Sequence, residues 1–406
     1  MTLAMRQQQF SRFALPERSV VKADNLALRR DLASRFYQGG CLDHAPVINT
    51  YQDLLSKFGD LSAVTNPLGK IKTVYHSELQ RVLDLTRSCH SPELVAEQIA
   101  FVRQAVLTTA FRLATIETGG DLALAIGGSA VNGVHSFLTD VDFVVLPHSA
   151  EDRNAARNVQ NMMIELLDTI GIESDGNLPS LFGYRTLAEL KQKYQPFTSR
   201  EARKAGHDDY AFQASYPFFL FLMDLRILDV SGGKADKPAY ESALKETGDS
   251  LTFLSPEHVH FVGREQFKET EQKAAAPKNP RAVDLKKSVF RLFHFSLYAA
   301  RAHYGIKTSD LWQVIKELAA KGAITRGEAE AAGEDLKFLI KIRHLAGFAL
   351  TNTFDSAILT DANLTQLAQV LGKSREELDS NILRSREDLL GIARKLFSLS
   401  SPAAEK

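Results

Sequence analysis

The sequence has 406 residues, 44% of them hydrophobic and 24% charged, which is too long for one ordinary domain and rich enough in apolar side chains for two or three. Lysine plus arginine and aspartate plus glutamate number 49 each, so no excess positive charge favours nucleic acid or an anionic membrane as a partner. Two cysteines, Cys41 and Cys89, exclude a disulfide framework and a four-cysteine zinc site.

Location follows from the same features. The N-terminus lacks the apolar core of a signal peptide, and no run of about 18 uncharged apolar residues predicts a membrane span. Few cysteines are typical of a reducing compartment. We therefore expect a cytoplasmic protein with no membrane partner.

The chain begins with a helical region. Apolar residues from 22 to 118 fall at helical spacing, as at Leu79, Val82 and Leu83 and again at Ile99 and Val102. This pattern predicts an N-terminal helical region within residues 1–118.

Short apolar runs then replace the helical pattern. "LALAI" (122–126) and "VDFVVL" (141–146) are bounded by Gly, Ser, Thr and Pro, which is typical of buried strands. The segment 150–170 opens with acidic residues and ends before Gly171, as a helix does. The order predicts a strand, turn, strand, helix unit.

Further along, residues 216–228 are apolar enough to be buried, but their periodicity does not decide between helix and strand. Residues 270–284 are rich in Ala, Pro and Lys and predict a linker, with a domain boundary near 280. Amphipathic patterns at 311–322 and 334–350 predict helices, so we expect a helical bundle over 284–397.

Two carboxylates stand at the start of the second predicted strand. Alternate residues of a strand face the same side, so Asp140 and Asp142 would project together while Val141 enters the core. Neighbouring carboxylates repel each other unless a cation lies between them, and oxygen ligands suit Mg²⁺ or Mn²⁺. The pair therefore predicts a divalent metal site.

A glycine-rich turn precedes these carboxylates. Its backbone N–H groups can approach a phosphate without obstruction by Cβ atoms, and a serine hydroxyl can add a hydrogen bond. The predicted nucleotide-binding residues are Gly127, Gly128 and Ser129.

Strand, Gly-Ser, ten intervening residues, Asp-Val-Asp and a further apolar run follow one another in this order. The pattern resembles the nucleotidyltransferase signature of the DNA polymerase beta superfamily. "GYRTLAEL" (183–190) and "LMDLRILDVSG" (222–232) are similar to Arg-Thr-Leu and Asp-x-Arg segments of the uridylyltransferase that modifies the nitrogen-signalling protein PII, and of related nucleotidyltransferases. The similarity covers roughly residues 70–397.

The resemblance implies an α+β fold, with a polymerase-beta-like mixed sheet and helices over 119–270, flanked by the N-terminal helical segment and the C-terminal bundle. It implies transfer of a nucleoside monophosphate from a triphosphate to an acceptor hydroxyl, with release of pyrophosphate. Asp140 and Asp142 would hold two Mg²⁺ or Mn²⁺ ions, while Gly128 and Ser129 position the β and γ phosphates. By resemblance the nucleotide would be UTP and the acceptor a protein tyrosine; the residues themselves indicate neither choice.

The turn departs from the family pattern. The family has an arginine and an acidic residue there, whereas this chain has Val131, Asn132 and His135. The departure motivates an alternative, a regulatory module that binds nucleotide without turnover. A nucleic-acid acceptor is disfavoured by the balanced charge.

The superfamily commonly uses a third acid on a neighbouring strand. Asp224, in the Asp-x-Arg segment, is our preferred catalytic candidate, with a salt bridge to Arg226 as the structural alternative. Glu173 and Asp175 follow the predicted helix and are the other candidates, with a solvated turn as their alternative.

Overall fold

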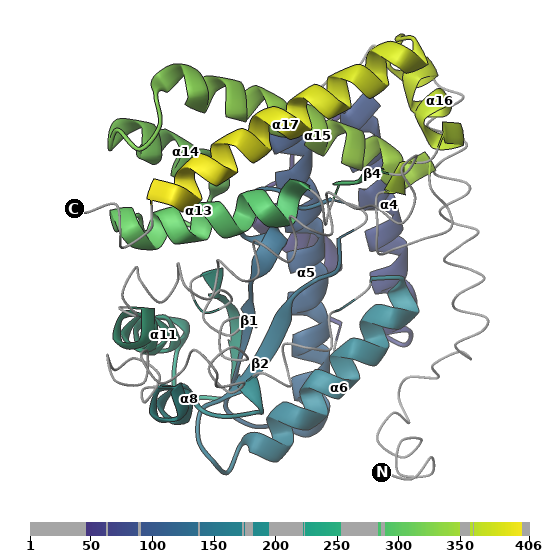
Figure 1. The fold of residues 1–406 in the computed structure, drawn as a ribbon. Coiled ribbons are helices and arrows are strands. Elements are labelled where there is room, and N and C mark those ends of the chain that lie inside the picture. Colours follow the sequence, from purple (N-terminus) through teal and green to yellow (C-terminus); the bar gives the residue numbers. More distant parts are fainter. Residues whose placement is uncertain are drawn as a thin grey trace.

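The chain folds into helices packed around a small antiparallel sheet, an α+β arrangement (Figure 1). The computed structural model describes residues 46–61, 64–87, 91–136, 139–172, 174, 182–194, 222, 224–252, 283–285, 289–349, 358–359 and 361–399. Most of the predicted apolar stretch 216–228 and of the predicted linker 270–284 lies outside these residues.

Among the described residues, the N-terminal region contains α3 (Tyr51–Phe58), α4 (Pro67–Arg87) and α5 (Pro92–Thr118). The Ser91 hydroxyl accepts a hydrogen bond from the Leu94 N–H at the start of α5, and Gly119, at φ 67°, ends it. Over the described part, the predicted helical region is confirmed.

The predicted strand, turn, strand, helix unit is confirmed as β1 (Leu122–Ile126), a 3₁₀ turn η1 (Gly128–Ala130), β2 (Phe143–Pro147) and α6 (Arg153–Ile170). Gly171, in the left-handed conformation, ends α6 as expected. Asp152 does not cap the helix; its carboxylate accepts from the Asp121 and Ser149 N–H groups instead.

Next in the chain are α8 (Leu187–Tyr194), β3 (Arg226–Ser231) and α11 (Lys237–Thr252). Strand β1 lies in the centre of the sheet, with β2 and β3 antiparallel to it on either side. The sequence predicted a mixed sheet, whereas the described three-stranded sheet is antiparallel; the parallel contact among the described residues is an isolated bridge between Val141 and Ser174, outside these strands.

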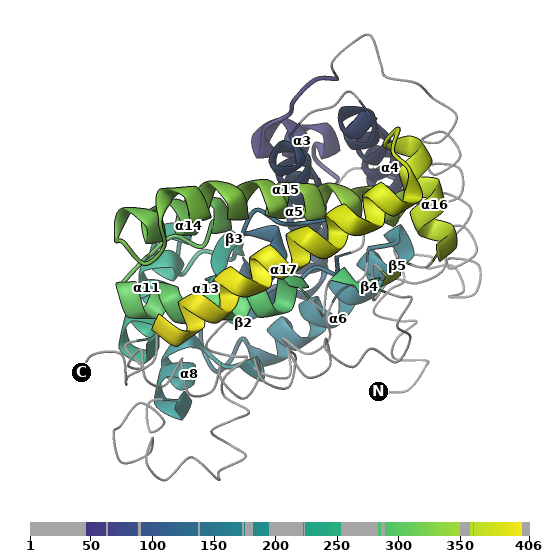
Figure 2. The ribbon, with the colours of Figure 1, turned by 45° about the horizontal axis from the view of Figure 1, so that its top comes forward.

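The C-terminal part is helical, as expected, and contains α13 (Arg291–Tyr304), α14 (Leu311–Ala320), α15 (Arg326–Ala349), α16 (Asp361–Val370) and α17 (Arg375–Leu399). Figure 2 shows α17 crossing the molecule beside α13 and α15, which agrees with their packing contacts. Residues 283–284, predicted as the end of a linker, form β4 (Val283–Asp284), which pairs with β5 (Ile358–Leu359).

Strands β1 and β2 are buried on both faces, which explains why these two strands are apolar runs without alternation, whereas β3 is more exposed. Leu122, Leu124 and Ile126 join a cluster of buried side chains that extends from α3 to α17. Ala123 and Ala125 face a second cluster, formed with α8 and α11. The N-terminal helices, the sheet and the C-terminal helices therefore share one core.

Helix α5 is long and apolar enough to cross a membrane, and it is the one helix of the described residues with this property. However, 72% of its apolar window is buried inside the protein. Burial against α3, α4, α6 and the sheet accounts for its composition, since a core helix must be apolar on most sides.

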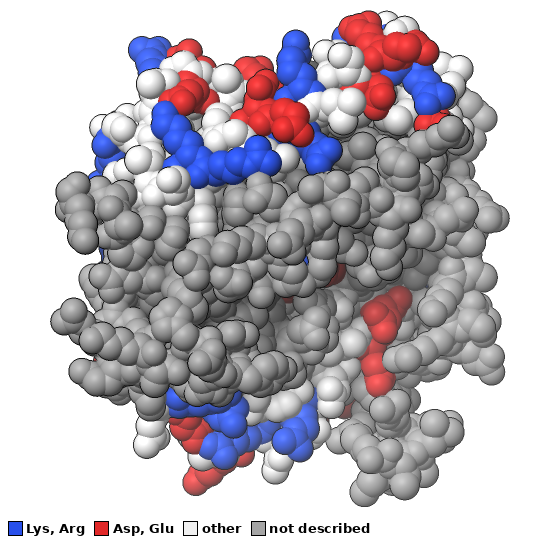
Figure 3. All heavy atoms as spheres, in the orientation of Figure 1, with Lys and Arg blue, Asp and Glu red and all other residues white. Residues whose placement is uncertain are grey.

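The described surface carries both signs of charge. In Figure 3, the Lys and Arg side chains over the C-terminal helices adjoin Asp and Glu side chains. Pairs such as Lys395 with Glu328 and Arg375 with Asp361 account for part of this mixing.

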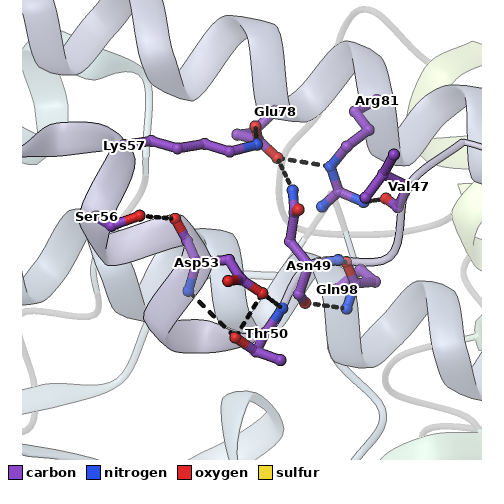
Figure 4. A network of polar contacts seen from close by, with 9 residues as sticks. All are labelled: Val47, Asn49, Thr50, Asp53, Ser56, Lys57, Glu78, Arg81 and Gln98. Carbon is purple, nitrogen blue, oxygen red and sulfur yellow. Dashed lines mark hydrogen bonds and ion pairs between the residues drawn. The ribbon is translucent and has the colours of Figure 1, made fainter.

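A polar network attaches the segment before α3 to α4 and α5 (Figure 4). Asn49 exchanges hydrogen bonds with the Gln98 side chain and donates to Glu78, which also accepts from Lys57 and Arg81. Although burial opposes ionisation, the bonds from Lys57 and Arg81 hold the pKa of Glu78 below its ordinary value. This glutamate therefore has a structural role.

Candidate active site

The site lies at one edge of the sheet, where β1 ends. Ile126, the last residue of β1, pairs with Phe143 of β2 on one side and with Arg226 of β3 on the other. The glycine-rich turn, the Asp-Val-Asp segment and the Asp-x-Arg segment therefore meet at this edge. The register thus places three of the motifs found in the sequence side by side.

Gly128 and Asp142 are in contact. Gly128 has a φ of 63°, and a Cβ built on it would overlap the Asp142 Oδ2 atom and come within 3.2 Å of its Cγ. The Gly127 N–H also donates to the Asp142 carbonyl, at 3.0 Å. Glycine at 128 thus makes room for the carboxylate at the start of the turn.

The burial of the Asp-Val-Asp segment alternates as the sequence predicted. Val141 is fully buried, while Asp140 and Asp142 are half-buried. Carboxylates that remain partly accessible in such a turn can bind a cation, because Mg²⁺ commonly takes one or two carboxylates and completes its shell with water and phosphate oxygens. Asp140 and Asp142 therefore supply oxygen donors of the kind that such an ion takes.

Ser129 bonds to a buried histidine. Its Oγ lies 2.7 Å from His135 Nδ1, and His135 Nε2 lies 2.9 Å from Arg103 Nη1. Burial, above all, together with the charge of Arg103, holds the pKa of His135 well below its ordinary value. The ring is therefore neutral at pH 7.

The C-terminal helices donate hydrogen bonds to the segment that follows Ser129. The Leu311 N–H donates to the Asn132 carbonyl, Trp312 Nε1 to the Gly133 carbonyl, and His344 Nε2 to the His135 carbonyl, at 3.1, 3.2 and 3.1 Å. Asn132 is 1% exposed. At the positions where the chain departs from the family pattern, Asn132 and His135 thus have packing and hydrogen-bonding roles.

Asp224 is buried in an ion pair. Its carboxylate accepts from Arg301 Nη1 at 2.8 Å and from the Tyr298 hydroxyl, both on α13. Burial raises the pKa of Asp224 even though Arg301 and Tyr298 favour the carboxylate. The sequence proposed Arg226 as the salt-bridge partner; Arg226 instead donates to the Ser309 hydroxyl at 2.6 Å. The catalytic role of Asp224 remains a prediction.

The competing third carboxylates, Glu173 and Asp175, lie outside the described residues. Ser174, between them in the sequence, pairs with Val141, between Asp140 and Asp142. Among the residues that the structure describes, no group of three or more His, Cys, Asp or Glu side chains forms a metal site.

The Arg-Thr-Leu segment has a local structural role. The Thr186 hydroxyl accepts from the Glu189 N–H, while the Glu189 carboxylate accepts from the Thr186 N–H, at 3.2 and 3.0 Å. This reciprocal pair caps the start of α8. The motif thus contributes to the second core cluster, through Leu187.

A cavity of about 1390 Å³ opens beside the turn, between α5, β3, α11, α13 and α14. Apolar side chains and both signs of charge line it, including Phe101, Ile126, Val131, Leu225, Ile306 and Trp312 with Arg226, Lys237, Lys245 and Lys307 and with Glu93, Glu97, Glu241 and Asp310. It exceeds the roughly 300–1,000 Å³ of ordinary ligand pockets, so a small molecule or a protein segment could enter.

Sequence reasoning did not find the side chains that support this site. Arg103, Tyr298, Arg301 and His344 come from helices distant in sequence. One signal was present: Arg103 is a single charge within the apolar run of α5, and a buried charge needs polar neighbours.

Comparison with protein-family models finds no model that matches the chain, and comparison with the curated proteins finds no matching relative.

Proposed function

We propose that this chain is a metal-dependent nucleotidyltransferase with a polymerase-beta-like fold, which transfers a nucleoside monophosphate from a triphosphate to an acceptor hydroxyl. The contact between Gly128 and the Asp142 carboxylate carries the proposal. It brings the two halves of the motif, the glycine-rich turn and the Asp-Val-Asp segment, together at one sheet edge. Each half by itself is a common feature of proteins, so their combination carries the argument.

Each group has a distinct role in the proposed reaction. Asp140 and Asp142 would hold Mg²⁺ or Mn²⁺, which supplies positive charge to the triphosphate. The backbone of Gly127 and Gly128 and the Ser129 hydroxyl would orient the phosphates. UTP as donor and a protein hydroxyl as acceptor belong to the proposal through the resemblance alone, whereas a cytoplasmic location is proposed from the small number of cysteines.

The acceptor would enter through the cavity between the sheet and α13 and α14. Trp312 lies at the border of this cavity, bonded to Gly133 of the turn. Mixed charges in the lining favour a protein or small molecule over a polyanion. Incubation of a lysate with each α-labelled triphosphate should label protein or a small molecule; label confined to RNA would contradict this acceptor class.

Titration calorimetry with the four triphosphates, with and without Mg²⁺ or Mn²⁺, tests the proposal. We expect binding to be weak without metal, and the double variant Asp140→Asn with Asp142→Asn to abolish turnover while its melting temperature is kept. Glu376→Gln with Glu377→Gln, two exposed residues of α17, is the control for lost charge. Tight metal-independent binding that survives the Asp substitutions would overturn the proposal.

The second candidate is a regulatory module that binds nucleotide without turnover. The buried position of Asn132 and the bonding of His135 within the protein favour it, because the turn then lacks the charged groups of the family pattern. Metal-dependent binding without transfer to any acceptor would support this candidate.

A further inference from the structure

The hydrogen bond between the Ser129 and His135 side chains decides whether the Ser129 hydroxyl donates to, or accepts from, its other neighbours. Ser129 Oγ and His135 Nδ1 are 2.7 Å apart, and either atom could donate. The second nitrogen of the imidazole decides which does, because a neutral imidazole carries one N–H and one acceptor nitrogen.

Arg103 determines whether that second nitrogen, Nε2, donates or accepts. Its Nη1 lies 2.9 Å from His135 Nε2, and a guanidinium donates hydrogen bonds but accepts none. Nε2 is therefore the acceptor, and the proton of the neutral ring is on Nδ1. The same guanidinium donates to the Thr139 carbonyl, next to Asp140, so Arg103 is held in this position.

The ring has little freedom to change this arrangement. His135 is fully buried, and its carbonyl accepts from His344 Nε2 at 3.1 Å. Burial, Arg103, Arg343 and His344 all lower the pKa of His135, so the ring stays neutral through the physiological range.

With Nδ1–H as the donor, Ser129 Oγ accepts, and its own O–H remains available to donate. Ser129 is partly exposed and follows Gly128, against which the Asp142 carboxylate lies. A hydroxyl whose lone pair is occupied by a buried donor presents its proton to an acceptor such as a phosphate oxygen.

We propose that His135 is a positioning residue, which holds Ser129 as a hydrogen-bond donor toward the polyphosphate of the bound nucleotide. The inference rests on the proposed function and adds one step to it. At a position where the family has charged groups in the turn, this chain uses a neutral histidine acting through a serine.

Nuclear magnetic resonance of the full chain with ¹⁵N-labelled histidine tests the tautomer without any ligand. We expect the His135 signals, assigned by their loss in His135→Gln, to show a protonated Nδ1 and an unprotonated Nε2 from pH 6 to 8. An Nε2–H tautomer would overturn the inference whatever the nucleotide does.

Affinity for a triphosphate with Mg²⁺ gives the second measurement. We expect His135→Leu to weaken binding roughly 10-fold, the effect of one lost hydrogen bond to a charged group. His135→Asn, which keeps an N–H donor near the Nδ1 position, should restore most of it. In a Ser129→Ala background, His135→Leu should have no further effect beyond about twofold, because the two residues then act through one bond.

The outcomes separate the two proposals. Absence of triphosphate binding by the unchanged chain would overturn the proposed function and, with it, the role of Ser129 as a hydrogen-bond donor to the polyphosphate. Triphosphate binding that His135→Leu leaves unchanged, or weakens equally in the unchanged chain and in the Ser129→Ala background, would overturn the inference alone.

Discussion

Gly128 meets two requirements that glycine alone satisfies together. Its φ of 63° is in the left-handed region, which costs other residues about 1–2 kcal/mol. Its missing Cβ also leaves the space that the Asp142 carboxylate occupies. The cost of backbone strain can therefore be separated from the loss of the site by substituting two glycines of similar φ, of which only Gly128 contacts Asp142.

Gly128→Ala should abolish metal-dependent nucleotide binding and lower the free energy of unfolding by about 1–3 kcal/mol. Gly119→Ala is the matched control, because Gly119 has a φ of 67° with nothing within 4 Å of a built Cβ. It should cost similar stability and leave binding intact. Calorimetry and urea unfolding measure the two effects; loss of binding in both variants would contradict a specific role for Gly128.

At the scale of elements, one buried ion pair joins β3 to α13. Asp224 precedes β3, and its partners Arg301 and Tyr298 lie on α13, with Arg301 and Asp224 each about 2% exposed. A second pair on the same strand, Asp229 with Arg112 of α5, is more exposed. The two pairs therefore offer a comparison of buried and surface electrostatics.

Asp224→Asn should lower the free energy of unfolding by about 3–5 kcal/mol, since it leaves the Arg301 charge buried without its counter-ion. Asp229→Asn should cost less than about 1 kcal/mol. Chemical unfolding measures both, alongside turnover and with Glu173→Gln and Asp175→Asn for comparison. Loss of turnover with unchanged unfolding would identify Asp224 as a catalytic acid, whereas early melting would assign it to the fold.

At the scale of the whole molecule, α3, the sheet and α13 to α17 share one core, and the C-terminal helices contain the buried His344 and the half-buried His294. The pKa values of His294 and His344 are lowered to about 4, chiefly by burial. In the unfolded chain they return to about 6.5. Unfolding therefore takes up protons between these limits.

The resulting pH dependence has a definite sign. The contribution of His294 and His344 to stability is complete above about pH 6.5 and is lost as the pH falls toward 4, at about 1.4 kcal/mol per pH unit for each histidine. His344→Gln, which keeps an N–H donor but does not titrate, should reduce the slope between pH 6 and 5 by that amount. Urea unfolding at pH 7, 6 and 5 measures it, and equal slopes in both proteins would contradict the assignment.

The sequence alone determined the elements around the site. Helical spacing predicted α4 and α5, short apolar runs predicted β1 and β2, and the glycine after α6 marked its end. These features depend on periodicity and on backbone conformation within a few residues, which are local properties. The motif residues Gly128, Asp140 and Asp142 were found in the same way, because they occupy one short segment of the chain.

Only the tertiary structure decided what surrounds that segment. Asp224 pairs with Arg301, 77 residues away, where the sequence proposed Arg226 as the salt-bridge partner, and Ser129 meets a histidine whose tautomer is fixed by Arg103 of α5. Partners of buried polar groups are selected by which helices pack together, because each group must find a hydrogen bond wherever the fold supplies one. No regular spacing in the sequence marks such partners. They are determined by the contacts that α5, α13 and α15 make with the end of β1.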